Sequence, residues 1–154
     1  MLKPGDLAPD FALPDADGKL KKLSELSERF KVVYFYPKDD TSGCTKEAID
    51  FSTLKPEFAR LGAAILGISP DSAASHAKFR HKHGLKVALL SDEQKSTIMA
   101  YGVWAEKKMY GRTYMGVERS TFLIGPDGKV LKVWRNVKVP GHVAAVLEEV
   151  KRHS

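Results

Sequence analysis

Two apolar segments set the strongest limit on what this chain can fold into. Val32–Tyr36 is β-branched or aromatic at every position, and Ala63–Ser69 is almost as apolar. A strand with one face in water alternates apolar and polar residues, whereas a strand covered on both faces does not. We therefore expect two buried strands in an α/β sheet with cover above and below.

The segments around these strands carry the start and stop signals of short elements. Turns that contain glycine predict two hairpins, and Ser24, Ser72 and Pro140 are residues suited to begin helices. We expect, in chain order, a hairpin of 11–14 and 19–23, a helix 24–30, a helix from about 45 that Pro56 kinks or splits, a helix 72–83, a strand 87–90, a helix 94–101, a loop 103–117, a hairpin of 119–124 and 129–137, and a last helix from 140.

Composition places the chain among soluble globular proteins. It has 154 residues, of which 43% are hydrophobic and 29% charged, and we expect one domain over residues 1–154. No apolar run is long enough to cross a bilayer, and the first residues lack the apolar core of a signal peptide. One cysteine cannot form an internal disulfide, so we expect a cytoplasmic protein without membrane association.

The formal net charge of +6 raises the question of nucleic-acid binding. The basic residues are scattered, however, with only short clusters at 19–22, 80–83 and 107–108. No helix-turn-helix, finger or RNA-binding signature accompanies them. We therefore expect a solvated basic surface and no specific nucleic-acid partner.

Cys44, the only cysteine, follows the first apolar strand and a polar turn, where a helix should start. The unpaired N–H groups and the positive dipole end of a helix start favour thiolate over thiol. Gly43 lets backbone N–H groups come close to a bound molecule, and Thr41 places a hydroxyl within one turn of the sulfur. Because Cys44 follows a loop, we expect its thiol to be reachable and to act as a nucleophile.

The other residues narrow the target of this nucleophile. A cysteine hydrolase needs a histidine base, but the five histidines fall in segments expected to be helix or C-terminal tail. A Cys-x-x-Cys couple is excluded by the absence of a second cysteine. His76 and His83, with His81 nearby, lack the ligands and spacing of a zinc site, so we expect no metal. The O–O bond of a peroxide, which needs no prior proton abstraction, is the leading candidate.

The segment Tyr36–Ala48, YPKDDTSGCTKEA, resembles the active-site signature of the peroxiredoxins, specifically the peroxiredoxin Q or bacterioferritin comigratory protein branch. Further segments similar to that family cover nearly the whole chain: Gly5–Phe11, Gly67–Asp71, Tyr101–Trp104 and Arg119–Ile124. The resemblance implies a thioredoxin-like fold with a central mixed β-sheet, helices on both faces and an N-terminal β-hairpin. It implies a peroxidase that reduces hydrogen peroxide and organic hydroperoxides without a cofactor, in antioxidant defence and redox homeostasis.

The resemblance also implies a role for each site residue. Cys44 is the peroxidatic nucleophile and becomes a sulfenic acid. Catalytic and substrate-binding roles fall to Thr41 and the N–H groups of Gly43 and Cys44, which align the peroxide. The remaining roles are positive charge from Arg119, exclusion of water by Pro37, and orientation of Arg119 by Glu47.

One departure from the family pattern concerns the resolving cysteine. Relatives carry it five residues after the nucleophile, where this chain has Ile49, or in the following helix, which we align at Arg80. A milder departure is Ser42, where relatives usually have proline. We expect a one-cysteine enzyme, a monomer or weak homodimer, that depends on an external thiol: thioredoxin, glutaredoxin or glutathione. The alternative is a redox sensor or holdase chaperone that signals through oxidised Cys44 without turnover.

Overall fold

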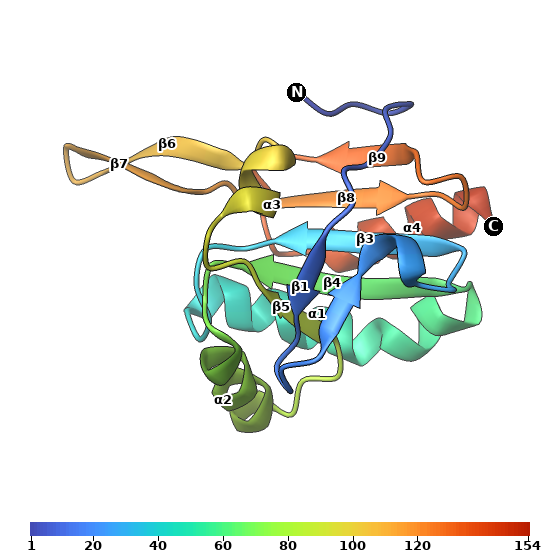
Figure 1. The fold of residues 1–154 in the computed structure, drawn as a ribbon, viewed down its shortest axis with the longest axis horizontal. Helices are drawn as coiled ribbons and strands as arrows, with labels where there is room; N and C mark the ends of the chain where they lie inside the picture. Colours follow the sequence, from blue (N-terminus) through green and yellow to red (C-terminus); the bar gives the residue numbers. More distant parts are fainter.

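A five-stranded sheet runs through the molecule in the order β5-β4-β3-β8-β9 (Figure 1). The computed structural model describes all residues from Met1 to Ser154. The strands of this sheet are β3 (Phe30–Phe35), β4 (Ala63–Ser69), β5 (Ala88–Ser91), β8 (Ser120–Ile124) and β9 (Val130–Trp134). The first three are parallel, whereas β8 and β9 run antiparallel to their neighbours. The sheet is mixed, as expected.

The position of β3 explains why its sequence does not alternate. Every residue from Val32 to Tyr36 is at most 1% exposed. Val32 and Tyr34 lie in a core cluster with α1 (Ser42–Arg60) and α4 (His142–His153), and Val33 and Phe35 lie in a second cluster. Burial of apolar surface on both faces therefore holds this strand at the centre of the sheet.

Different elements cover the two faces of the sheet. α1 and α4 pack on one face, and α2 (Ala73–His83) contacts β5 (Figure 1). The other face is covered by the antiparallel strand pair β1 (Ala12–Pro14) and β2 (Leu20–Lys22), the 3-10 turn η1 (Leu23–Glu25) and α3 (Ser96–Ala100). The expected N-terminal strand pair and the helices on both faces are confirmed.

The helix expected from Ser24 to Phe30 is wrong. Only η1 forms, and Phe30 already pairs with Ala63 at the start of β3. The backbone N–H and the hydroxyl of Ser24 donate to the Asp10 carboxylate at 3.0 and 2.8 Å. This serine fixes the chain to Asp10 and does not cap a helix.

The loop expected over 103–117 is also wrong. These residues form a hairpin of β6 (Trp104–Met109) and β7 (Arg112–Val117), whose strands pair only with each other and which protrudes from the body (Figure 1). Tyr110 and Gly111 form the turn, and both have positive φ, 51° and 75°. Two positive φ values in a two-residue loop match the twist of the strands they join. Most of the hairpin is in water, so no burial pattern marks its strands.

The other helix boundaries follow their capping residues. The Ser72 hydroxyl accepts a hydrogen bond from the Ser75 N–H at 3.1 Å at the start of α2, and Gly84 ends it in the left-handed conformation. The expected split at Pro56 is absent, because α1 runs through this residue as one helix. None of the helices is both long and apolar enough to span a membrane.

Candidate active site

Cys44 lies in the first turn of α1, which follows β3. It belongs to the core cluster on the sheet face that α1 and α4 cover. Thr41 is the residue before the helix, and its carbonyl accepts the first helical hydrogen bond, from Thr45 N–H at 2.8 Å. The N–H groups of Gly43 and Cys44 precede that bond and have no partner in the helix. The expectation that the thiol is reachable is wrong in this conformation, because Cys44 is only 1% exposed.

Arg119 joins Cys44 and Glu47 from a distant part of the chain. It lies between β7 and β8, and its Nη2 donates to Cys44 Sγ at 3.2 Å while its Nη1 donates to Glu47 Oε1 at 2.6 Å. Burial acts to lower the pKa of Arg119, but the negative charges of Glu47 and Cys44 outweigh burial and raise it. The guanidinium therefore keeps its positive charge next to the sulfur.

Glu47 is the most deeply buried group of the site. Its side chain is 0% exposed, and its second oxygen, Oε2, has no hydrogen-bond partner. Burial raises the pKa of Glu47 to about 7, although the Arg119 charge and hydrogen bond act to lower it. The hydroxyl of Tyr34 is likewise buried without a partner, and its pKa is raised by burial and by the negative charge of Glu47. The site thus holds a carboxylate at a cost in desolvation.

The other residues expected in the site are near Cys44, Arg119 and Glu47 in the chain or in space. A Cβ at Gly43 would lie 3.2 Å from Arg119 Nη2, so this glycine leaves room for the guanidinium. The Thr41 hydroxyl donates to the Lys38 carbonyl at 2.9 Å and does not bond Cys44. With its proton used there, the Thr41 oxygen has lone pairs free to accept a hydrogen bond. Pro37 is half-buried just after β3.

The loop that leads into α1 is fixed to α2 through Asp39, which the sequence analysis did not identify. Its carboxylate accepts from the hydroxyls of Tyr36 and Ser75 at 2.6 and 2.8 Å, and Oδ2 lies 2.7 Å from His76 Nδ1. Its N–H donates to Asp71 Oδ2 at 2.8 Å. Three of these partners lie more than 30 residues away in sequence, so no local spacing indicates the cluster.

No histidine contacts Cys44. His76 on α2 and His142 on α4 are buried, and their hydrogen bonds go to Asp39 and Thr121. Burial and the Arg119 charge lower the pKa of His142 to about 4. The sulfur therefore lacks the histidine base that a cysteine hydrolase needs.

The residues around Asp39 include the only group with ligand atoms close enough together to hold a metal ion. Ligand atoms of Asp39, Asp71 and His76 all lie within 4.8 Å of one another. Asp39 Oδ2 is hydrogen-bonded to His76 Nδ1, and Asp71 Oδ2 accepts from the Asp39 N–H and the Ser69 hydroxyl, which suits an anchor for the loop. His83, considered as a zinc ligand beside His76, instead lies 2.8 Å from a carboxylate oxygen of Asp40 on the surface.

Arg80 and Ile49, the two positions at which the sequence analysis looked for a resolving cysteine, lie on different helices. Arg80 forms a double hydrogen bond with the Asp17 carboxylate, at 2.8 and 3.2 Å, which ties α2 to the N-terminal hairpin. Ile49 is 38% exposed on α1. Neither residue can attack a sulfenate.

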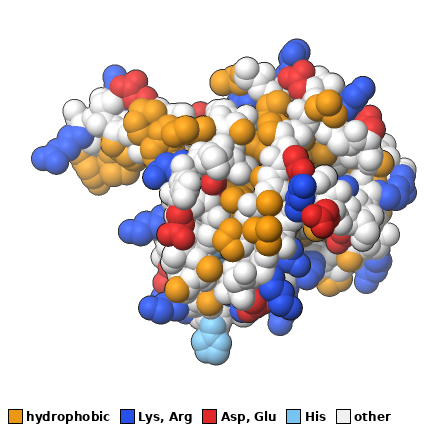
Figure 2. All heavy atoms as spheres, in the orientation of Figure 1, with side chains coloured by type: hydrophobic (Ala, Val, Ile, Leu, Met, Phe, Trp, Pro, Cys, Tyr) orange, Lys and Arg blue, Asp and Glu red, His pale blue; other side chains and the backbone are white.

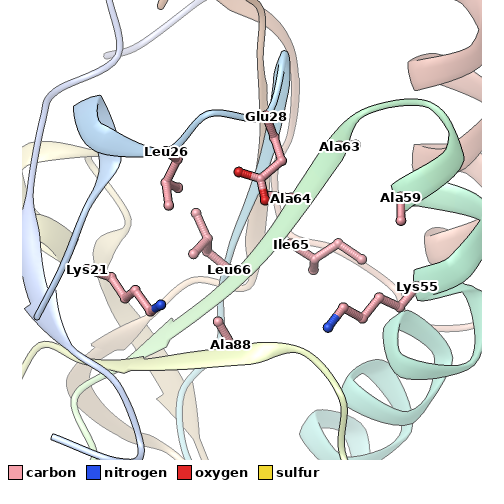
Figure 3. Close-up of a pocket in the computed structure, with 10 residues that line it drawn as sticks. All are labelled: Lys21, Leu26, Glu28, Lys55, Ala59, Ala63, Ala64, Ile65, Leu66 and Ala88. Atoms are coloured by element: carbon pink, nitrogen blue, oxygen red, sulfur yellow. The ribbon is translucent and has the colours of Figure 1, made fainter. Parts of the chain in front are cut away.

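A hollow of about 330 Å³ lies elsewhere on the molecule, between the second half of α1, β4 and the segment 21–28 (Figure 3). Alanine and leucine side chains line most of it, with Lys21, Glu28 and Lys55 at its rim. None of the residues expected to be catalytic lines this hollow.

Comparison with known proteins shows the family of this chain. Residues 4–133 match the AhpC/TSA family. Peroxiredoxin Bcp of Bacillus subtilis is 48% identical over 147 residues, which are 96% of this chain and 94% of that protein. Peroxiredoxin Bcp of Escherichia coli is 40% identical over 99% of this chain and 98% of its own length.

Solved structures of related proteins superpose closely on this chain. The bacterioferritin comigratory protein of Xanthomonas campestris superposes with a TM-score of 0.90 at 44% identity, covering 99% of this chain and 98% of its own. A PrxQ variant from Xylella fastidiosa superposes with a TM-score of 0.94 at 39% identity, covering 99% and 98%. These likenesses confirm the thioredoxin-like peroxiredoxin fold. The chain belongs to the AhpC/TSA family and, within it, to the Bcp and peroxiredoxin Q peroxiredoxins.

Proposed function

We propose that this protein is a thiol-dependent peroxidase that reduces hydrogen peroxide and small organic hydroperoxides through a sulfenic acid on Cys44. Membership of the peroxiredoxins supports the peroxidase activity. The structure of the Xanthomonas campestris relative addresses alkyl peroxide reduction by that protein, which supports the organic substrates. The observation that carries the proposal is the Arg119 guanidinium, which donates to Cys44 Sγ and Glu47 Oε1 at once.

The oxidation step follows from the groups around the sulfur. The Cys44 thiolate attacks one oxygen of the hydroperoxide, an S–O bond forms as the O–O bond breaks, and the leaving alkoxide takes a proton to become the alcohol or water. Arg119 stabilises the charge that moves from sulfur to oxygen. The free N–H groups of Gly43 and Cys44 donate to the peroxide, and the Thr41 oxygen accepts from its O–H. Pro37, beside this loop, excludes water.

The reduction step needs an outside thiol because the chain has no second cysteine. A thiol attacks the Cys44 sulfenic acid, the S–O bond breaks, and a mixed disulfide and water form; a second thiol then attacks the mixed disulfide, releases the Cys44 thiolate and leaves the reductant as a disulfide. Thioredoxin, glutaredoxin and glutathione are the candidate reductants. Because Cys44 is buried, the first turn of α1 must open before a large thiol can reach it.

Steady-state peroxide consumption with these three reductants tests the proposal, with intact-mass analysis of Cys44 and the variant Cys44→Ser as the control. We expect continuous consumption with at least one reductant, and none in the variant. Consumption that stops after one equivalent with every reductant would favour a redox sensor or a holdase that acts through oxidised Cys44. A thiol that reacts with peroxide no faster than free cysteine would contradict both functions.

A further inference from the structure

The β6–β7 hairpin exposes an unusual amount of apolar surface for a protruding element. Four large apolar side chains lie within seven residues: Met109 is 54% exposed, Tyr110 96%, Tyr114 43% and Met115 51%. Figure 2 shows orange, apolar side chains grouped along the protruding hairpin, with blue cationic side chains beside them and at its tip. An exposed apolar patch with a polar rim is a frequent mark of an interaction site.

The base of this hairpin leads along the chain directly to the active site. Directly paired residues of antiparallel strands share a face, so Lys107 and Tyr114 lie together, followed by Met109 and Arg112. The Lys107 side chain is half-buried, and its pKa is lowered first by burial and then by the Arg119 charge. β7 ends at Val117, two residues before Arg119. The base of the hairpin and the catalytic arginine are therefore parts of one continuous segment.

The charges of the hairpin select the kind of partner. Its strands carry three cations and one anion: Lys107, Lys108, Arg112 and Glu106. A second copy of this chain would bring the same cations and a net charge of +6 to the contact, which disfavours self-association. An acidic surface with an apolar centre complements the hairpin in both charge and polarity.

We propose that the β6–β7 hairpin is the docking surface for a protein reductant, a dithiol protein whose surface around its reactive cysteine is acidic and apolar. This inference rests on the proposed function, because only an enzyme with a sulfenate to reduce needs such a partner. Docking places the partner beside the first turn of α1. One partner thiol attacks the Cys44 sulfenate with loss of water, and the second partner thiol then displaces Cys44 and leaves the partner as a disulfide.

Turnover with two reductants tests the proposal. The protein reductant is an acidic thioredoxin, kept reduced by its reductase and NADPH, and the small reductant is dithiothreitol, which needs no docking surface. The variants are Met109→Ser with Tyr110→Ser, which removes apolar surface at the tip, and Lys108→Glu with Arg112→Glu, which reverses one cation on each face of the hairpin. We expect the ratio of thioredoxin-supported to dithiothreitol-supported kcat/KM to fall about tenfold in each. Added salt lowers this ratio in the wild type and has less effect on the charge-reversed variant.

Matched variants at distant exposed positions provide the controls. Leu20→Ser with Met99→Ser removes side chains that are 68% and 56% exposed, and Lys151→Glu with Arg152→Glu reverses two cations on α4. Both controls keep the wild-type ratio. An equal ratio in the hairpin variants and the controls overturns the docking inference, as does a wild type that turns over with dithiothreitol but not with thioredoxin. A wild type with no turnover on either reductant contradicts the proposed function instead.

Discussion

The buried carboxylate of Glu47 allows a prediction in which stability and activity move in opposite directions. Glu47→Gln keeps the shape of the side chain, removes its charge and places an N–H donor where Oε2 has no partner. In the folded protein the pKa of Glu47 is about 7, against 4.5 for the unperturbed group. At about 1.4 kcal/mol per pH unit, this difference corresponds to about 3 kcal/mol.

The sign of the pH dependence follows from proton release. Below pH 4.5, Glu47 is protonated in both the folded and the unfolded chain, and its burial carries no charge penalty. As pH rises from 4.5 to about 7, the unfolded chain releases a proton that the folded chain retains, so the free energy of unfolding falls. Above pH 7 the penalty is complete. Glutamine has no such penalty, so the variant gains about 3 kcal/mol relative to the wild type across this range.

Urea unfolding followed by circular dichroism, from pH 4.5 to pH 8, measures this gain. Glu57→Gln, an exposed carboxylate on the same helix, is the matched control because water solvates its charge. Without the charged pair that orients Arg119, we also expect the rate of Cys44 oxidation to fall about tenfold. A stability difference between Glu47→Gln and wild type that stays constant with pH, or that shrinks as pH rises, would refute this reasoning.

Three further substitutions probe the site. Arg119→Lys keeps the charge but replaces the two Nη atoms that serve Glu47 and Cys44 with a single nitrogen on a shorter side chain, so peroxide oxidation of Cys44 slows about tenfold or more by stopped flow; an unchanged rate would contradict the role of the guanidinium geometry. Thr41→Val removes the hydrogen-bond acceptor for the peroxide and slows the same step about tenfold with an unchanged circular dichroism spectrum; a wild-type rate would remove the hydroxyl from the mechanism. His76→Leu leaves Asp39 with a lost partner, which costs about 3 kcal/mol in urea unfolding and loosens the loop, so that iodoacetamide alkylates Cys44 faster; alkylation at the wild-type rate would show that the anchor does not control access.

Continuous apolar sequence made the centre of the fold predictable. Val32–Tyr36 and Ala63–Ser69 are buried on both faces, and burial is the property that a hydrophobic pattern reports. The hairpin 104–117 was missed because water covers most of its surface, and Tyr110 is not the asparagine or aspartate that usually marks its type of turn. Ser24 was misread because its hydroxyl serves Asp10, a contact that no local pattern indicates.

The site, like the fold, has features that the sequence predicted and features that it did not. The position of Cys44 at a helix start follows from local sequence, and the resemblance to the peroxiredoxins pointed to Glu47 and Arg119, which the fold brings together with it. The burial of Cys44 and the anchor through Asp39 and His76 depend on contacts between distant segments, which spacing along the chain does not encode.

The second-order rate constant for oxidation of Cys44 by hydrogen peroxide tests the central claim most directly. Stopped-flow measurement on the reduced protein, with free cysteine at the same pH as the reference, isolates the effect of the site from that of the thiol itself. The hydrogen bonds from Arg119 and the free N–H groups of the first helical turn predict a rate constant about 10³-fold or more above that of free cysteine. A rate constant equal to that of free cysteine would contradict the assignment of this site to peroxide reduction.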